Sequence, residues 1–159
     1  MSSANLSEEP IIYELEVALP DMKHIADAAL VHDRPIHTFA DDSVVRCMSG
    51  VPRVVRRARG YVPKVIEVAP PFRTPVLAFG ADLKNTFCLG SDRAAILSQH
   101  LGDLESEAAV YAEQSALDHY LRLFGDHVRV VACDLHPNYS STRLAEEWSA
   151  RSRVPLIRV

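Results

Sequence analysis

The stretch that most constrains the fold is "VRVVACD", residues 128–134. Its apolar residues are nearly continuous and lack the alternation of a strand that has one face in water. The run therefore predicts a strand buried on both faces, as in a parallel sheet. Parallel strands need long crossover connections, usually helices. An α/β fold is favoured around this strand.

A long helix is predicted ahead of it, over residues 104–124. Asp103 is a suitable N-cap, and Gly125 is a stop signal at the other end. Apolar residues recur at helical spacing, which predicts one buried face. The positions expected on that face are Val110, Leu117, Leu121 and Phe124.

The remaining patterns of this half complete an ordered series. Before the long helix, three strands are predicted in "PVLAFG", "NTFCLG" and "RAAILS". After residues 128–134, Ser140 or Ser141 caps a second helix with Leu144 and Trp148 on one face, and "VPLIRV" forms a last strand. The order β-β-β-α-β-α-β is typical of the first half of a ribonuclease-H-like or actin-like domain.

The first half of the chain has a different character. The β-branched runs "DSVVRCM" and "VPRVVRRA" are separated by Ser49-Gly50, which predicts a hairpin. The stretch "APPFRTP" then holds three of the ten prolines, which favours an extended linker. We therefore predict a division into residues 1–68, a proline-rich linker 69–75, and residues 76–159.

Composition excludes several classes of protein. An apolar share of 48% over 159 residues is enough for a core, and a net charge of −4 argues against general nucleic-acid binding. No run of residues is apolar enough for a membrane helix, and residues 1–10 do not resemble a signal peptide. A cytoplasmic location is expected. The cysteines form no disulfide or zinc pattern; they are Cys47, Cys88 and Cys133.

Two polar clusters lie close together in "GADLKNTFCLGSDRAAILSQHLGDLE", residues 80–105. In the first, Lys84 brings a cation beside an amide and a carboxylate, a set that neutralises and orients a phosphate or acyl-adenylate. In the second, His100 and Asp103 are suited to orienting a substrate or a proton. A plain hairpin turn and a helix cap are the alternative interpretations. The first cluster consists of Asp82, Lys84 and Asn85.

Six segments resemble, in order, consecutive signatures of the HypF-type carbamoyltransferases, the maturation factors of [NiFe] hydrogenases. They are "SSANLSEEPI", "HDRPIHTFADDSVVR", "RRARGYVP", "GADLKNTFCL", "SQHLGDLE" and "ACDLHPNYSSTRLA". The resemblance implies an α/β chain that holds the C-terminal part of a YrdC-like domain followed by the start of an actin-like carbamoyltransfer domain. It also implies that the chain is one piece of a larger enzyme and is incomplete and inactive alone.

The resemblance and the residue chemistry together define candidate site residues. Guanidinium groups on and beside the hairpin can pair with phosphate oxygens, and His136 ends a strand at the usual place for ligand contacts. The catalytic set is Lys84, His100 and Asp103. The nucleotide-binding set is Ser3, Asn5, Ser43, Arg46, Arg57, Arg59, Asp82, Asn85 and His136.

The family implies substrates and partners as well. They are ATP with magnesium, carbamoyl phosphate, and a maturation protein whose C-terminal cysteine accepts the carbamoyl group; the remainder of the enzyme is a further possible partner, as a separate chain. Zinc or iron is expected only in segments beyond this chain, so no tightly held zinc or iron is predicted here and no metal ligand is assigned. Three alternatives stay open: a non-catalytic remnant, a nucleotide- or RNA-binding module, and an O-carbamoyltransferase of natural-product biosynthesis.

Overall fold

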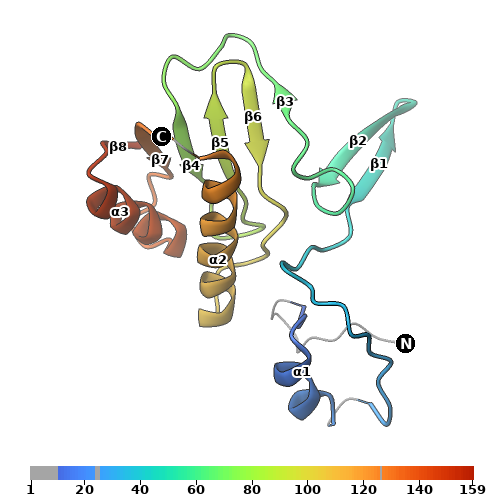
Figure 1. Cartoon of the computed structure of the whole chain (residues 1–159). Helices are drawn as coiled ribbons and strands as arrows, with labels where there is room; N and C mark the ends of the chain where they lie inside the picture. Colours follow the sequence, from blue (N-terminus) through green and yellow to red (C-terminus); the bar gives the residue numbers. More distant parts are fainter. Residues whose placement is uncertain (1–10, 24–25, 126) are drawn as a thin grey trace.

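The computed structural model describes residues 11–23, 26–125 and 127–159. Within these residues the chain forms three helices and eight strands (Figure 1). The helices are α1 (Leu15–Met22), α2 (Glu107–Phe124) and α3 (Ser140–Ser152). The strands are β1 (Val44–Met48), β2 (Val51–Arg56), β3 (Ile66–Glu67), β4 (Val76–Phe79), β5 (Phe87–Ser91), β6 (Ala94–Leu97), β7 (Val130–Cys133) and β8 (Leu156–Arg158). None of the helices among these residues is long and apolar enough to cross a membrane.

The larger sheet has the strand order β3-β6-β5-β4-β7-β8. Strands β4, β5 and β6 form an antiparallel meander, and β7 lies parallel to both β4 and β8. The predicted order β-β-β-α-β-α-β from residue 76 is confirmed. The parallel pairing of β7 is confirmed too, and its Val131 and Cys133 are 0% and 1% exposed.

The core lies between this sheet and its helices, with α2 crossing in front of the sheet and α3 beside β7 (Figure 1). Leu77 and Phe79 of β4 are buried, whereas their neighbours Val76 and Ala78 are half-buried. This alternation directs one face of β4 into the core. The core cluster also contains Phe87, Leu89, Ala116, Leu117, Tyr120 and Val131.

The predicted start of the long helix was wrong by one turn. The N-cap of α2 is Ser106, whose hydroxyl accepts a hydrogen bond from the Ala109 N–H at 3.1 Å. Asp103 is not free to cap this helix, because its carboxylate accepts the Lys84 N–H at 2.6 Å. The C-terminal stop at Gly125 is confirmed.

The predicted buried face of α2 was only partly right. Leu117 is buried, but Phe124 is 41% exposed and Val110 is half-buried. Small and polar residues occupy the inward positions that a search for large apolar residues passes over. The buried residues of α2 are Ala109, Glu113, Ala116, Leu117 and Tyr120.

The hairpin prediction is confirmed. β1 and β2 pair antiparallel with Met48 opposite Val51, so that Ser49 and Gly50 form a two-residue turn. Both turn residues have positive φ (52° and 76°), as a type I′ turn requires. All five residues of β1 are exposed, and so are the first five of β2. The hairpin therefore stands apart from the core, beyond β3 (Figure 1).

The proline-rich stretch runs along the turn between β5 and β6. The Phe72 N–H donates to the Asp92 carbonyl at 2.7 Å, and a Cβ placed on Gly90 would come within 2.6 Å of the Phe72 ring. Glycine at position 90 thus makes room for this aromatic ring. The division of the chain at residues 69–75 stays a prediction.

We expect the isolated chain to self-associate through its exposed hairpin. Among the described strands β1 and β2 pair only with each other, so each keeps an open edge, and both carry exposed valines. Open apolar edges pair with other chains. We expect light scattering after size exclusion to show a mass that rises with concentration, and Val51→Lys to shift the chain towards monomer. The control Val65→Lys, also at an exposed valine but outside the hairpin, should leave the mass unchanged; a monomeric wild type at all concentrations would contradict the prediction.

Candidate functional site

Two loops meet at the carboxyl ends of the parallel strands β4 and β7. Residues 80–86 follow β4, and residues 134–139 follow β7. Parallel strands place these ends at one edge of the sheet, the usual position of ligand sites in α/β folds. Gly80 is required where the first loop begins, because a Cβ there would lie 2.5 Å from the Thr86 carbonyl oxygen.

Asp82 joins these two loops. Its Oδ2 accepts the Ser140 N–H at 2.9 Å, and its Oδ1 accepts the Ser141 N–H and the Ser141 hydroxyl, each at 3.0 Å. Ser140 and Ser141 were predicted as caps, but the N-cap is Tyr139 and its side chain makes no capping hydrogen bond. The carboxylate of Asp82 instead satisfies the free N–H groups at the start of α3.

Lys84 sits on a tightly bonded turn. Its φ of 52° is left-handed, and its N–H bonds to Asp103. The neighbouring Asn85 is 1% exposed, and its side-chain amide donates to the Ala81 carbonyl at 2.8 Å. Its backbone pairs with Gly102. Residues 82–85 are thus held against residues 101–104, with Lys84 itself exposed.

His136 lies on the second loop and is exposed. Its N–H donates to Asp134 Oδ1 at 2.7 Å, and its ring stacks on Tyr139 with centroids 4.2 Å apart. The stacked pair stands beside the start of α3, and His136 Nδ1 accepts the Asn138 N–H at 3.4 Å. This is the position predicted for a ligand contact, and the role itself stays a prediction.

A cavity of about 540 Å³ brings together predicted residues from three motifs. Arg57, Lys84 and His100 all line it. Arg56 adds a third permanent cation, and no carboxylate is among the lining residues. The rest of the lining is Val44, Val54, Val55, Thr86 and Leu97. The cavity lies between the hairpin and the sheet and suits an anion that carries apolar groups.

His100 is oriented from the other side by Asp41. His100 Nδ1 and Asp41 Oδ2 are 2.9 Å apart, and the same carboxylate lies 3.8 Å from the Arg56 guanidinium. The His100 N–H also donates to the Arg57 carbonyl at 3.1 Å. His100 and Asp103 therefore do not act as the predicted pair, because each side chain has a different partner.

Arg57 has an unused donor. One of its terminal N–H groups donates to the Lys64 carbonyl at 3.1 Å, and its guanidinium lies 5.9 Å from the centre of the Tyr61 ring. Its Nε is buried without a hydrogen-bond partner. A buried donor of this kind needs an acceptor, which an anionic oxygen in the cavity would provide.

The other predicted nucleotide residues have varied surroundings. The Ser43 hydroxyl accepts the Ala58 N–H and donates to the Arg59 carbonyl, both at 2.9 Å, so it braces the base of the hairpin. Arg59 donates to the Ala40 carbonyl and pairs loosely with Asp42. Arg46 is exposed opposite Arg53 on the hairpin. Ser3 and Asn5 lie outside the described residues.

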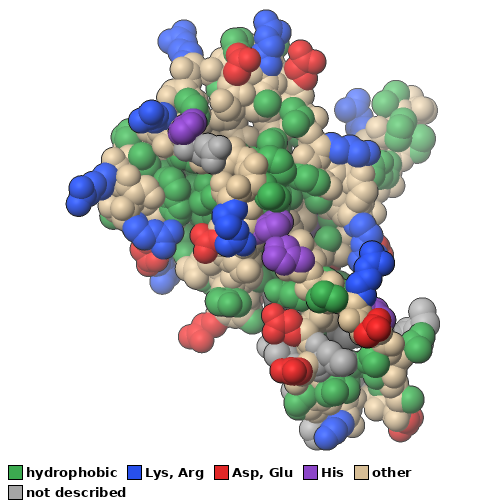
Figure 2. Space-filling view, viewed as in Figure 1, with side chains coloured by type: hydrophobic (Ala, Val, Ile, Leu, Met, Phe, Trp, Pro, Cys, Tyr) green, Lys and Arg blue, Asp and Glu red, His purple; other side chains and the backbone are tan. Residues whose placement is uncertain are grey.

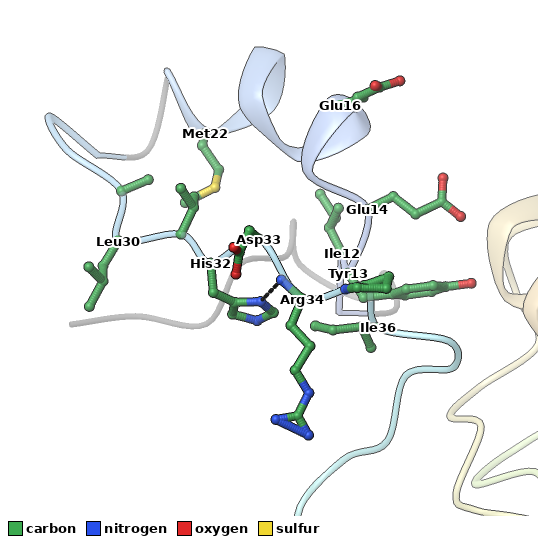
Figure 3. A pocket seen from close by; sticks show the side chains of 13 residues that line it. Ile12, Tyr13, Glu14, Glu16, Met22, Leu30, His32, Asp33, Arg34 and Ile36 are labelled. Carbon is green, nitrogen blue, oxygen red and sulfur yellow. Dashed lines mark hydrogen bonds between the residues drawn. The ribbon is translucent and has the colours of Figure 1, made fainter.

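A second cavity, of about 550 Å³, lies among residues 12–36 (Figure 3). His32, Asp33 and Arg34 of the "HDRPI" motif line it together with Tyr13. The Arg34 N–H donates to His32 Nδ1 at 3.2 Å, and the Arg34 side chain points away from α1 in this view. Among the described residues, none of the predicted catalytic or nucleotide-binding residues lines this cavity.

Sequence reasoning missed Glu113. This residue is 0% exposed on the inner face of α2, and neither of its carboxyl oxygens has a hydrogen-bond partner. Burial, and secondly the negative charge of Asp82, raises the pKa of Glu113 to about 8. The side chain is therefore protonated at neutral pH. The only signal in the sequence was a glutamate at a helix position where Ala116, Leu117 and Tyr120 face inward.

The histidines were given no joint role, yet two of them meet. His37 Nε2 and His119 Nδ1 are 3.1 Å apart, although 82 residues separate them in sequence. Their contact depends on how residues 37–41 fold against α2, which no local spacing reveals. Among the described residues no group of three or more His, Cys, Asp or Glu is placed to hold a metal.

Two protein-family models match different parts of the chain. A model described as "HypF Kae1-like domain" matches residues 72–159. A second model, for the Sua5, YciO and YrdC proteins and described as "Telomere recombination", matches residues 1–58. These two matches define a class of proteins in which a YrdC-type segment precedes a Kae1-like segment.

Individual relatives lead to one family. The chain is 39% identical to "Carbamoyltransferase HypF" of Rhizobium leguminosarum bv. viciae, over 91% of this chain and 19% of the relative. It is 42% identical to "Carbamoyltransferase HypF2" of Cupriavidus necator, over 100% of this chain and 20% of the relative. The chain belongs to the HypF carbamoyltransferase family. It spans about a fifth of the length of these relatives.

Solved structures agree with this assignment. Full-length HypF in its phosphate- and nucleotide-bound form superposes with a TM-score of 0.90 and 39% identity, over 99% of this chain and 24% of that one. T. kodakarensis HypF gives a TM-score of 0.92 and 36% identity, over 100% of this chain and 21% of that one. The fold described above is therefore that of the corresponding region of HypF.

We expect Glu113 to make the chain less stable as pH rises. Its pKa is 4.5 ordinarily and about 8 in the folded chain, so the native state binds more protons than the unfolded state between these values. Its contribution to stability is present below pH 4.5 and is lost as pH rises through 8, by up to about 1.4 kcal/mol per pH unit. Glu113→Gln should therefore gain stability over the wild type as pH increases from 5 to 8, in urea unfolding. The exposed Glu147→Gln is the control, and parallel stability curves for wild type and Glu113→Gln would contradict the burial argument.

Proposed function

We propose that this chain is part of an ATP-dependent carbamoyltransferase that makes carbamoyl-adenylate. The carbamoyl group is then transferred to the C-terminal cysteine of a hydrogenase maturation partner, in the cytoplasm. Membership of the HypF family supports the general activity. The name of the relatives supports hydrogenase maturation rather than natural-product carbamoylation or a non-catalytic remnant. Because the chain spans a fifth of those relatives, the complete reaction belongs to the larger assembly, with residues 76–159 beginning its actin-like domain.

The observation that carries this proposal is the cationic cavity between the hairpin and the sheet. Arg57, Lys84 and His100 come from three separate motifs, and they line the same space. Arginine offers a planar fork to phosphate oxygens, and lysine offers a compact positive charge. The unpartnered Nε of Arg57 is a donor already desolvated and without an acceptor. A phosphate-bearing substrate such as ATP, carbamoyl phosphate or an acyl-adenylate fits this chemistry.

The roles of the residues follow from their contacts. Lys84 neutralises negative charge as it develops on a phosphate or on the leaving group, and Asp103 positions Lys84 through its backbone N–H. Asp41 holds His100 through Nδ1, which leaves Nε2 as the nitrogen that accepts or donates a proton. The stacked His136 and the N-terminus of α3, which Asp82 caps, flank the same edge of the sheet. Magnesium would accompany the nucleotide as it does with ATP in general.

A hybrid enzyme provides the test. Residues 1–159 replace the matching fifth of the Cupriavidus necator relative, and carbamoyl-phosphate-dependent exchange between ATP and pyrophosphate is measured. We expect exchange from the hybrid and none from the 159-residue chain alone, because the chain holds only part of the assembly. Lys84→Ala in the hybrid should lower the rate by about 100-fold or more, the effect of removing one group that stabilises developing charge.

A matched control variant distinguishes the loss of the Lys84 charge from general damage to the hybrid enzyme. Lys64→Ala removes an exposed lysine outside the cavity while keeping the carbonyl that binds Arg57, and it should retain exchange. A folded hybrid with no exchange beside an active parent would overturn the proposed function. Full exchange by the Lys84→Ala hybrid would overturn the role of Lys84, and exchange by the chain alone would overturn its incompleteness.

A further inference from the structure

Two histidines form a contact on the surface that the proposed function does not use. His37 Nε2 lies 3.1 Å from His119 Nδ1, and the ring centroids are 4.6 Å apart at an interplanar angle of 63°. His37 is exposed, and His119 projects half-buried from α2. Figure 2 shows a contacting pair of histidines near the middle of this face. The pair is open to solvent on one side.

The separation of the two nitrogens matches what a metal ion needs. Zinc binds imidazole nitrogen at about 2.0–2.1 Å, and at a tetrahedral angle two such nitrogens lie about 3.3–3.4 Å apart. The observed 3.1 Å is shorter by only a few tenths of an ångström. The rings must reorient for both lone pairs to meet at one ion, and His37 is exposed.

The hydrogen bond between the two rings also leaves a route to two free lone pairs. One ring now donates its N–H to the other, and a shift of that proton to the far nitrogen of the ring frees a second lone pair without any net loss of protons.

We propose that His37 and His119 form a binding site for a divalent metal ion of the kind that prefers imidazole, such as zinc, nickel or copper. Two side chains supply nitrogen, and water completes the coordination, since no third His, Cys, Asp or Glu joins the pair within the described part of the chain. The nearby Arg122 opposes the ion and limits its affinity. The site therefore exchanges metal and does not retain it through purification, in line with the sequence expectation of no tightly held zinc or iron.

A bound ion would also link two parts of the chain. His37 belongs to the stretch matched by the Sua5-type model, and His119 to the stretch matched by the HypF Kae1-like model. A bound ion would fasten the segment before the hairpin to helix α2. Because residues 37–41 also bring Asp41 to His100, the ion would steady one wall of the cationic cavity.

The experiment is a titration of the apo chain with zinc, nickel and copper chlorides at pH 7.5, followed by calorimetry and thermal unfolding. We expect one ion per chain, affinity in the order copper above nickel and zinc, and a melting temperature that rises with metal concentration. Magnesium, which prefers oxygen ligands, should have no effect. His37→Gln and His119→Gln should each weaken binding by roughly tenfold or more, since even the loss of an outer-shell partner costs 10–100-fold. Arg122→Gln should strengthen it.

The control is His127→Gln, which removes an exposed histidine outside the pair and should bind metal as the wild type does. Far-ultraviolet circular dichroism distinguishes lost ligands from lost folding. Three results would overturn the proposal: binding unchanged in both pair variants, binding equally weakened by His127→Gln, or one ion per two chains with metal-dependent dimerisation. The readout is metal binding alone, so failure here would leave the carbamoyltransferase proposal unaffected.

Discussion

The contact on which the candidate site depends is the carboxylate of Asp82 at the start of α3. The N–H groups of a helix's first turn lack partners within the helix and carry partial positive charge. In α3 the first turn has no acidic residue, and the N-cap Tyr139 makes no side-chain capping bond. Asp82 supplies the missing acceptor from 58 residues away, with both oxygens engaged. Such a cap is worth about 1 kcal/mol, and it also fixes the loop after β4 against the loop that carries His136.

The protonation of Glu113 is linked to this carboxylate, although burial is the main cause. Burial first, and the negative charge of Asp82 second, raise the pKa of Glu113 to about 8, so this carboxyl group is protonated at neutral pH. The N–H groups at the start of α3 donate to Asp82. The two acidic residues thus have different surroundings, because Asp82 accepts hydrogen bonds at a helix terminus and Glu113 is buried without a hydrogen-bond partner. Asn85 Oδ1 and Thr142 Oγ1 are likewise buried without partners, so this region holds more polar atoms than its own hydrogen bonds satisfy.

Features with a local cause were predictable from the sequence. The apolar run of β7, the apolar strand pattern of β4 and the Ser49-Gly50 turn each specify their own structure, and each prediction is confirmed. Features that depend on distant residues were not predictable. Asp103 resembled a helix cap until its bond to the Lys84 N–H was visible, and His100 finds its partner in Asp41, 59 residues earlier. The inward face of α2 was predicted only in part, because alanines and a protonated glutamate occupy positions that a search for large apolar residues passes over.

The site residues also show why motif order alone could not define a cavity. Arg57, Lys84 and His100 come together where the segments on both sides of the hairpin, residues 37–43 and strand β3, bind to the sheet. Phe39 enters the core, the Gln99 side-chain amide donates to the Phe39 carbonyl at 3.3 Å, and the base of the hairpin bonds to His100. The end of the hairpin contributes Arg56 and Arg57 to the lining, and the loops after β4 and β6 contribute Lys84 and His100. Neither of the stretches matched by the two family models contains the whole lining, so a cationic site of this composition exists only where both are joined.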